Sequence, residues 1–185
     1  MTEASLTNSY GVMKKSKIEQ SSPVEQSYTD PTAEWVKKSW SKKKEKKYSI
    51  NDFDQIKELG SGKYGHVFLA REKKSNFICA LKIIEKKLLR EEEITEQFIR
   101  ELKIQVYLNH PNIIRMYGFF DDAVNIYLIL ELAMGGQLFK QLKKLQSMPE
   151  QKVANIMRQV CQAVNELHAN QIIHRDIKPE NIVLH

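Results

Sequence analysis

The spacing of apolar and polar residues changes along the 185-residue chain. Up to about residue 48, apolar residues are sparse, and Ser, Thr, Gln and Lys dominate. Segments of this composition bury too little apolar surface to fold alone. From residue 53 onward, short stretches alternate between apolar and polar positions, and later stretches repeat at helical spacing. We therefore predict a disordered, basic N-terminal tail at 1–48 followed by an ordered region.

Short stretches of alternating or continuously apolar residues predict strands because each is bounded by turn residues. They lie at 53–59, 66–71, 77–84, 113–120 and 125–130. Between the third and fourth, the period becomes helical from 92 to 108, with Phe98, Leu102 and Gln105 on one face. This pattern predicts an α+β fold in which a five-stranded antiparallel sheet is accompanied by one long helix.

The remainder of the chain is predicted to be helical. After the hinge-like Leu-Ala-Met-Gly-Gly at 132–136, Leu138, Leu142 and Leu145 recur at the spacing of a short helix. A longer helix is predicted from the Ser-Met-Pro-Glu stretch at 147–150, which has the pattern of a capping box. Its apolar residues continue to Leu167.

Composition narrows the classes of function. Hydrophobic residues make up 42% of the chain, enough for a packed core, and no apolar run approaches the length of a membrane span. Cys79 and Cys161 lie in apolar surroundings, which predicts two buried thiols in a reducing compartment. The net charge of +6 is concentrated at 37–47, beside Trp35 and Trp40. This block is either a solvated tail or a patch for an acidic partner; without a recognition pattern, we do not expect nucleic-acid binding.

Three glycines, Gly60, Gly62 and Gly65, precede Val67 in the order G-x-G-x-x-G-x-V. Glycines let a backbone approach a phosphate chain closely, with amide N–H groups facing the oxygens. The same glycine spacing marks dinucleotide-binding folds, where the turn opens a helix. Here residues 67–70, Val-Phe-Leu-Ala, are typical of a strand. We therefore predict a hairpin that covers phosphates.

Lys82 lies within an otherwise apolar predicted strand, where an unpaired ammonium would be costly. It needs an anionic partner, and the candidates are nucleotide phosphates and Glu101 on the predicted helix. The alternative is that Lys82 belongs to an edge strand and that Glu101 faces solvent.

The most specific stretch is His-Arg-Asp-Ile-Lys-Pro-Glu-Asn at 174–181. It combines an acidic residue, Asp176, with Lys178 and Asn181 at short spacing. Asp176 would accept or orient a hydroxyl proton, Lys178 would steady a transferring phosphoryl group, and Asn181 would bind Mg²⁺. The alternative, a polar loop without catalytic role, does not explain this order and spacing. The loop predicts a phosphotransferase.

Together these elements resemble the eukaryotic serine/threonine protein kinases, and within them the Aurora kinases. The resemblance covers 53–185, and three stretches carry it: VFLAREKKSNFICALK at 67–82, RELKIQVYLNHPNIIRMYGFF at 100–120 and IYLILELA at 126–133. Gln105 supports the Aurora group, because most kinases place an apolar residue there. The family fold has two lobes, which implies an N-lobe at 53–131 and the hinge with part of the C-lobe at 132–185.

The resemblance also implies how ATP would bind. The adenine would lie between Leu59, Val67 and Ala80 on one side and Val183 on the other. Hinge backbone groups of Glu131 and Ala133 would bond to it. The remaining nucleotide contacts implied are Gly60, Gly62, Lys63, Gly65, Lys82, Glu180 and Asn181.

Partners and location follow from the same resemblance. It implies protein substrates with basic residues before the phosphorylated Ser or Thr, and an activating protein on the N-lobe. Gln137 stands where other basophilic kinases have a glutamate. The resemblance therefore does not imply recognition of a substrate arginine further from the phosphorylated residue. A cytoplasmic or nuclear location is expected, with spindle or centrosome association implied by the family alone.

The family sequence continues beyond the catalytic loop with an Asp-Phe-Gly motif, an activation segment and further helices. We therefore expect a fragment, truncated after the catalytic loop, that is inactive alone although its family transfers the γ-phosphoryl group of MgATP. The alternative is a natural non-catalytic product that regulates by binding nucleotide or a partner.

Overall fold

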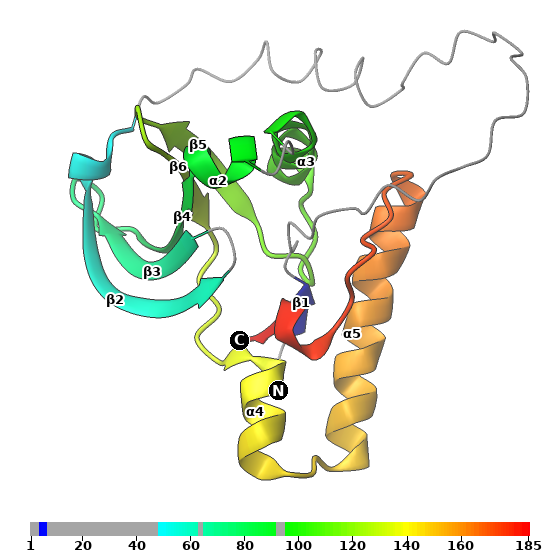
Figure 1. Ribbon diagram of the computed structural model, residues 1–185. Helices are drawn as coiled ribbons and strands as arrows, with labels where there is room; N and C mark the ends of the chain where they lie inside the picture. The colour runs from blue at the N-terminus through cyan, green and yellow to red at the C-terminus, as the bar shows by residue number, and fades with distance from the viewer. Residues whose placement is uncertain (1–3, 7–47, 63–64, 92–94) are drawn as a thin grey trace, which may run out of the picture.

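The computed structural model describes residues 4–6, 48–62, 65–91 and 95–185. Figure 1 shows a sheet with α3 beside it and a second part that contains α4 and α5. In chain order the elements are β1 (Ala4–Leu6), η1 (Ile50–Asp52, a 3-10 helix), β2 (Phe53–Gly62), β3 (Gly65–Glu72), β4 (Ile78–Glu85), α2 (Lys86–Glu91), α3 (Thr95–Tyr107), β5 (Met116–Asp121), β6 (Asn125–Leu130), β7 (Gly136–Gln137), α4 (Leu138–Leu145), α5 (Glu150–Ala169), η2 (Pro179–Asn181, a 3-10 helix) and β8 (Ile182–Leu184).

The predicted five-stranded antiparallel sheet is confirmed, with strand order β2-β3-β4-β6-β5. One face packs under α3, where Phe98 and Leu102 join Ile84 and Leu128 in a buried cluster. The other face carries a second cluster that contains Leu81 and aromatic side chains of β2, β5 and β6. Because β4 lies in the middle of this sheet, its side chains are covered on both faces.

Two short elements differ from the prediction. The helix α2 (Lys86–Glu91) was missed because six residues are too few to show a period. The strand predicted at 113–120 begins only at Met116. Ile113 and Ile114 are buried ahead of it, and Ile113 forms an isolated parallel bridge with Leu6 instead of joining the sheet.

The helical part has its own core, in which α5 contributes Ile156, Val160 and Leu167. The predicted capping box at its start was wrong: Pro149 is the N-cap, and no side chain caps the helix. Ser147 still belongs to the turn that closes α4, since its backbone N–H donates to Leu145 O at 2.7 Å. Cys79 is buried as predicted, whereas Cys161 is exposed because it lies on the outer face of α5.

The prediction of disorder throughout 1–48 was wrong at Ala4–Leu6. These residues form β1, the edge strand of a small sheet with order β1-β8-β7, and all three are buried. Tyr48 is also described and packs against the sheet. Three residues are too short a stretch to stand out in a polar sequence. The basic block at 37–47, with Trp35 and Trp40, lies outside the described residues.

No helix in the part of the chain that the structure describes is both long and apolar enough to cross a membrane.

Candidate active site

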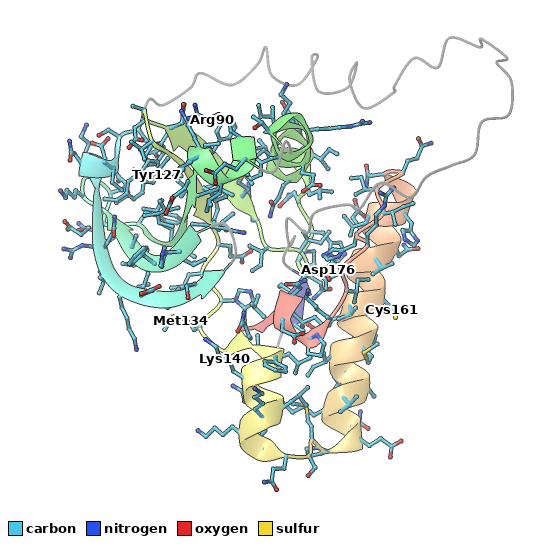
Figure 2. The ribbon with its side chains drawn as sticks, viewed as in Figure 1. Arg90, Tyr127, Met134, Lys140, Cys161 and Asp176 are labelled. Atoms are coloured by element: carbon cyan, nitrogen blue, oxygen red, sulfur yellow. The ribbon has the colours of Figure 1, made fainter. Side chains whose placement is uncertain are left out.

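The candidate site draws on the β2–β3 turn, the β4–α3 pair, the hinge after β6, and the segment that leads into β8. Figure 2 shows Asp176 on that last segment, next to the strands β1 and β8. The site therefore combines residues from the sheet with residues from the helical part.

The glycine turn is a hairpin, as predicted, because β2 and β3 pair antiparallel up to Gly62 and Gly65. Gly65 has φ +149°, and a Cβ there would lie 1.9 Å from Ile83 O on β4. Only glycine allows this approach of the turn to the neighbouring strand. At Gly60 and Gly62 a Cβ would meet nothing within 4 Å. Their backbone is open on that side, as a ligand-binding turn requires; Lys63 lies outside the described residues.

Lys82 occupies the centre of the sheet, opposite Val67 on β3 and Leu128 on β6. Burial disfavours its charged form and lowers its pKa to about 8, while the Glu101 carboxylate raises it. The Glu101 carboxylate on α3 is thus close enough to favour the charged form of Lys82. Glu101 is placed by the helix α3. Three buried residues hold this helix on the sheet: Phe98, Leu102 and Gln105, which are 2%, 3% and 4% exposed.

Asp176, Lys178 and Asn181 converge into one cluster. The Lys178 ammonium lies 2.9 Å from Asp176 Oδ1. The Asn181 amide donates to Asp176 Oδ2 at 2.9 Å and to the Asp176 carbonyl at 2.8 Å. Each carboxylate oxygen accepts from one of these groups, and a carboxylate has about four acceptor positions. The Asp176 carboxylate is therefore held in place by both neighbours.

The backbone conformation of 174–181 explains how Asp176, Lys178 and Asn181 come together. Arg175 has φ 64°, a left-handed conformation that turns the chain at this point. The Asp176 N–H then donates to His174 Nδ1 at 3.3 Å. Pro179 starts η2, and the Asn181 N–H donates to Lys178 O at 2.9 Å. This turn buries Asn181, which is 8% exposed, and holds its amide against Asp176.

The residues implied for an adenine lie around the hinge. Ala80 pairs with Leu130 on β6 and with Leu69 on β3. Val67 pairs with Lys82, two residue pairs further along the same strands. The Lys140 ammonium donates to Leu59 O at 3.5 Å, which ties β2 to α4. At the other side of the hinge, the Gly135 N–H donates to Leu184 O at 2.7 Å, beside Val183.

Sequence reasoning missed what fixes the hinge itself. The Glu131 N–H donates to Arg115 O at 2.9 Å, and the Arg115 N–H donates to Glu131 Oε2 at 3.1 Å. Of the two backbone groups of Glu131, the carbonyl is therefore the one a ligand can use. Gly135 is also needed, because a Cβ there would lie 2.6 Å from Leu184 O. The Gly-Gly pair was the one signal of this close approach.

A divalent metal ion fits this donor set only together with a nucleotide. The Asn181 side-chain oxygen and the Asp176 carboxylate are the oxygen donors of the cluster. Among the described residues, no group of three or more His, Cys, Asp or Glu side chains could hold a metal. Mg²⁺ commonly takes one or two protein oxygens and completes its shell with phosphates and water. Asn181 is the residue that would hold it here.

Comparison with known proteins identifies the class. Residues 53–185 match the protein kinase domain, so the chain belongs to the protein kinase family. Membership of this family implies ATP, a divalent metal ion and protein substrates.

Within the family, the chain is Aurora-like. It is 49% identical over 139 residues to an Aurora kinase of Dictyostelium discoideum, covering 75% of this chain and 36% of that protein. It is 45% identical over 140 residues to serine/threonine-protein kinase Aurora-1 of Arabidopsis thaliana, covering 76% and 48%. It is 47% identical over 137 residues to Aurora kinase B of Mus musculus, covering 74% and 40%. The chain thus spans half or less of the length of these relatives.

The lowered pKa of Lys82 predicts unusual reactivity. With a pKa of about 8, roughly half of its amines are neutral at pH 8, against well under 1% for a lysine near 10.4. Trace acetylation at pH 8, followed by mass spectrometry, should label Lys82 faster than its burial would otherwise allow. Its rate should rise up to about pH 8 and level off above it.

The variant Glu101→Gln removes the carboxylate that raises this pKa, so the levelling should move to lower pH. Glu91→Gln is a matched control, because Glu91 is exposed and pairs with Lys87 at 3.7 Å. It should leave the Lys82 profile unchanged. A Lys82 labelling rate that does not level off near pH 8, or that responds equally to Glu101→Gln and Glu91→Gln, would contradict the assignment.

Proposed function

We propose that this chain provides the nucleotide-binding and phosphotransfer residues of a serine/threonine protein kinase. The reaction is transfer of the γ-phosphoryl group of ATP to a protein hydroxyl. The observation that carries the proposal is the cluster of Asp176, Lys178 and Asn181, in which a carboxylate, an ammonium and an amide meet within hydrogen-bond distance. A loop that merely linked α5 to β8 would not need all three.

Asp176 accepts, or orients, the proton of the attacking hydroxyl. The Lys178 ammonium, 2.9 Å from Asp176 Oδ1, lies beside the position where negative charge develops on the phosphoryl oxygens. Such transition states spread charge over these oxygens, so that placement of cations supplies most of the catalysis. Mg²⁺, when bound with ATP, would neutralise phosphate charge, and Asn181 would hold it.

Lys82 binds the phosphates from the sheet side, while Glu101 favours its charged form. Glycines of the β2–β3 turn cover the phosphates with backbone N–H groups. The adenine packs against Leu59, Val67, Ala80 and Val183, and the hinge backbone at Glu131 and Ala133 bonds to it. Lys63 and Glu180 complete the nucleotide contacts proposed.

The finer assignments rest on the family resemblance. We propose substrates with basic residues before the phosphorylated Ser or Thr, an activating protein on the sheet-containing lobe, and a cytoplasmic or nuclear location with spindle or centrosome association. A regulator that binds nucleotide or a partner without transferring phosphate is the second candidate. It is favoured if the chain binds ATP and shows no transfer that depends on Asp176.

Nucleotide binding tests the first half of the proposal. Titration calorimetry with ATP and Mg²⁺ should give one binding site in this chain. Lys82→Met should weaken it by about 10-fold or more, because a charge-assisted contact contributes about 1.5–3 kcal/mol. Lys86→Met is the matched control, since Lys86 pairs with Asp121 at 2.6 Å at the far end of β4. Equal affinity in all three proteins would remove Lys82 from the site.

Phosphotransfer tests the second half, in the protein that carries this domain. With radiolabelled ATP and a basic peptide, Asp176→Asn should reduce turnover at least about 100-fold, because a positioned acid–base group contributes 10²–10⁴-fold. ATP affinity should change little. Asp54→Asn, which weakens only the exposed pairs of Asp54 with Arg71 and Lys73, should keep full turnover. Unchanged turnover in Asp176→Asn would refute the role.

A further inference from the structure

A histidine–glutamate pair spans the two strands of the hairpin that carries the glycine turn. His66 Nδ1 on β3 lies 2.7 Å from Glu58 Oε1 on β2. Glu58 is opposite Phe68 in the strand register, so His66 is its diagonal neighbour on the same face of the sheet. The His66 ring also lies beside the Phe68 ring, with the two centroids 6.2 Å apart. The strand register therefore places the imidazole within reach of Glu58.

The two partners lie on either side of an irregularity in the β2–β3 ladder. On β2, Leu59 is an extra residue between Glu58 and Gly60, whose partners on β3 are consecutive residues. An extra residue of this kind disrupts the ladder locally and bends the strand. His66 is opposite Ser61, beyond the extra residue, whereas Glu58 precedes it. The pair thus bridges the bulge between the body of the hairpin and its glycine turn.

The stretch of β2 next to the turn lies at an edge of the sheet. In the order β2-β3-β4-β6-β5, β2 pairs with β3 alone, whereas β3 is also held by β4. The Lys140 ammonium donates to Leu59 O at 3.5 Å, close to the upper limit for a hydrogen bond. The position of the β2 arm of the turn therefore depends on the contact between Glu58 and His66.

This contact depends on protonation of the ring. Histidine side chains change charge between about pH 5 and 8. An imidazolium has a hydrogen on Nδ1 in every case, whereas only one of the two neutral tautomers does. The protonated His66 ring therefore donates to the Glu58 carboxylate and also attracts it by charge. The neutral ring can donate through one tautomer and adds no charge.

Other titratable groups share this face of the sheet. Ile83 on β4 is opposite His66, so Glu85, two residues along, lies on the same face and is exposed. Tyr127 on β6 is opposite Ile83, and burial is the main cause that raises its pKa, so it stays neutral while histidine titrates. Of the carboxylates of Glu58 and Glu85, that of Glu58 is the one bonded to the ring.

We propose that His66 is a positioning residue of the nucleotide site, which braces the bulge at Leu59 through Glu58 and so holds the glycine turn over the phosphates. The brace is strongest when His66 is protonated. Nucleotide affinity therefore falls as the pH rises through the range in which histidine loses its proton. The inference rests on the proposed function for its nucleotide, whereas the brace itself can be measured without one.

Titration calorimetry of the full chain with ATP and Mg²⁺, at pH 6 and at pH 8.5, tests the effect on the nucleotide. Glu58→Gln should weaken the affinity about 3-fold at pH 6, an effect of the size expected for an exposed ion pair. At pH 8.5 it should match the unchanged protein. Comparison at one pH cancels the titration of ATP and of Lys82, which both proteins share.

A charge rescue separates this role from a merely structural one. His66→Lys keeps a positive charge at both pH values, so it should bind ATP as the unchanged protein does at pH 6 and about 3-fold more tightly than it at pH 8.5. Asp54→Asn is the control, because its exposed pairs lie at the far end of the same two strands. It should leave the affinity unchanged at both pH values. An equal loss in Glu58→Gln at both pH values, or a His66→Lys affinity that follows that of the unchanged protein, would overturn the proposal.

Hydrogen exchange without nucleotide measures the brace directly. At pH 6, Glu58→Gln should increase exchange of the β2 and β3 amides next to the turn, while those of β4 and β6 keep their protection. Unchanged exchange would overturn the brace whatever the calorimetry gives. Faster exchange with unchanged ATP affinity would overturn the role in nucleotide binding. Faster exchange in a chain that binds no ATP would instead refute the proposed function and leave the brace in place.

Discussion

The three-residue strand β8 is the element on which the site depends, because three separate parts of the chain are hydrogen-bonded to it or adjoin it. The hinge reaches it through the Gly135 N–H, which donates to Leu184 O at 2.7 Å. The loop 174–181 runs directly into it through the buried Asn181. The N-terminal strand pairs with its remaining edge. Displacing β8 would therefore move the hinge and the catalytic loop together, and this explains why glycine is required at 135, where a Cβ would strike Leu184.

Sequence predicted the sheet well because its signals are local. The short apolar stretch at 125–130 predicted β6, and the glycine spacing predicted the β2–β3 hairpin, since both depend on residues close together in the chain. Lys82 and Glu101 could be paired from sequence because a charge in an apolar strand demands a partner. The Asp176 cluster was equally accessible, because its three residues lie within one turn.

What sequence did not reveal depends on contacts between distant residues. β1 is held by Asn112 and Gln159, more than 100 residues away, and its own three residues carry no periodic signal. The exposed Cys161, Val153 and Met157 on α5 were likewise not distinguishable from buried positions on that helix. A hydrophobic period shows that a face exists, and only packing shows how much of it is covered.

The charges of the site are arranged in two groups, each within its own part of the molecule. Lys82 interacts with Glu101 on the sheet side, and Asp176 is held by Lys178 and Asn181 in the loop. The bonds that relate the two parts near the site, Gly135 to Leu184 and Lys140 to Leu59, run through the hinge and the glycine turn. Each group is thus organised before a ligand arrives. A nucleotide would contact Lys82 with its phosphates and the 174–181 loop through its metal ion. Its binding would favour the arrangement in which both charged groups face it, and would thereby align the two parts of the site.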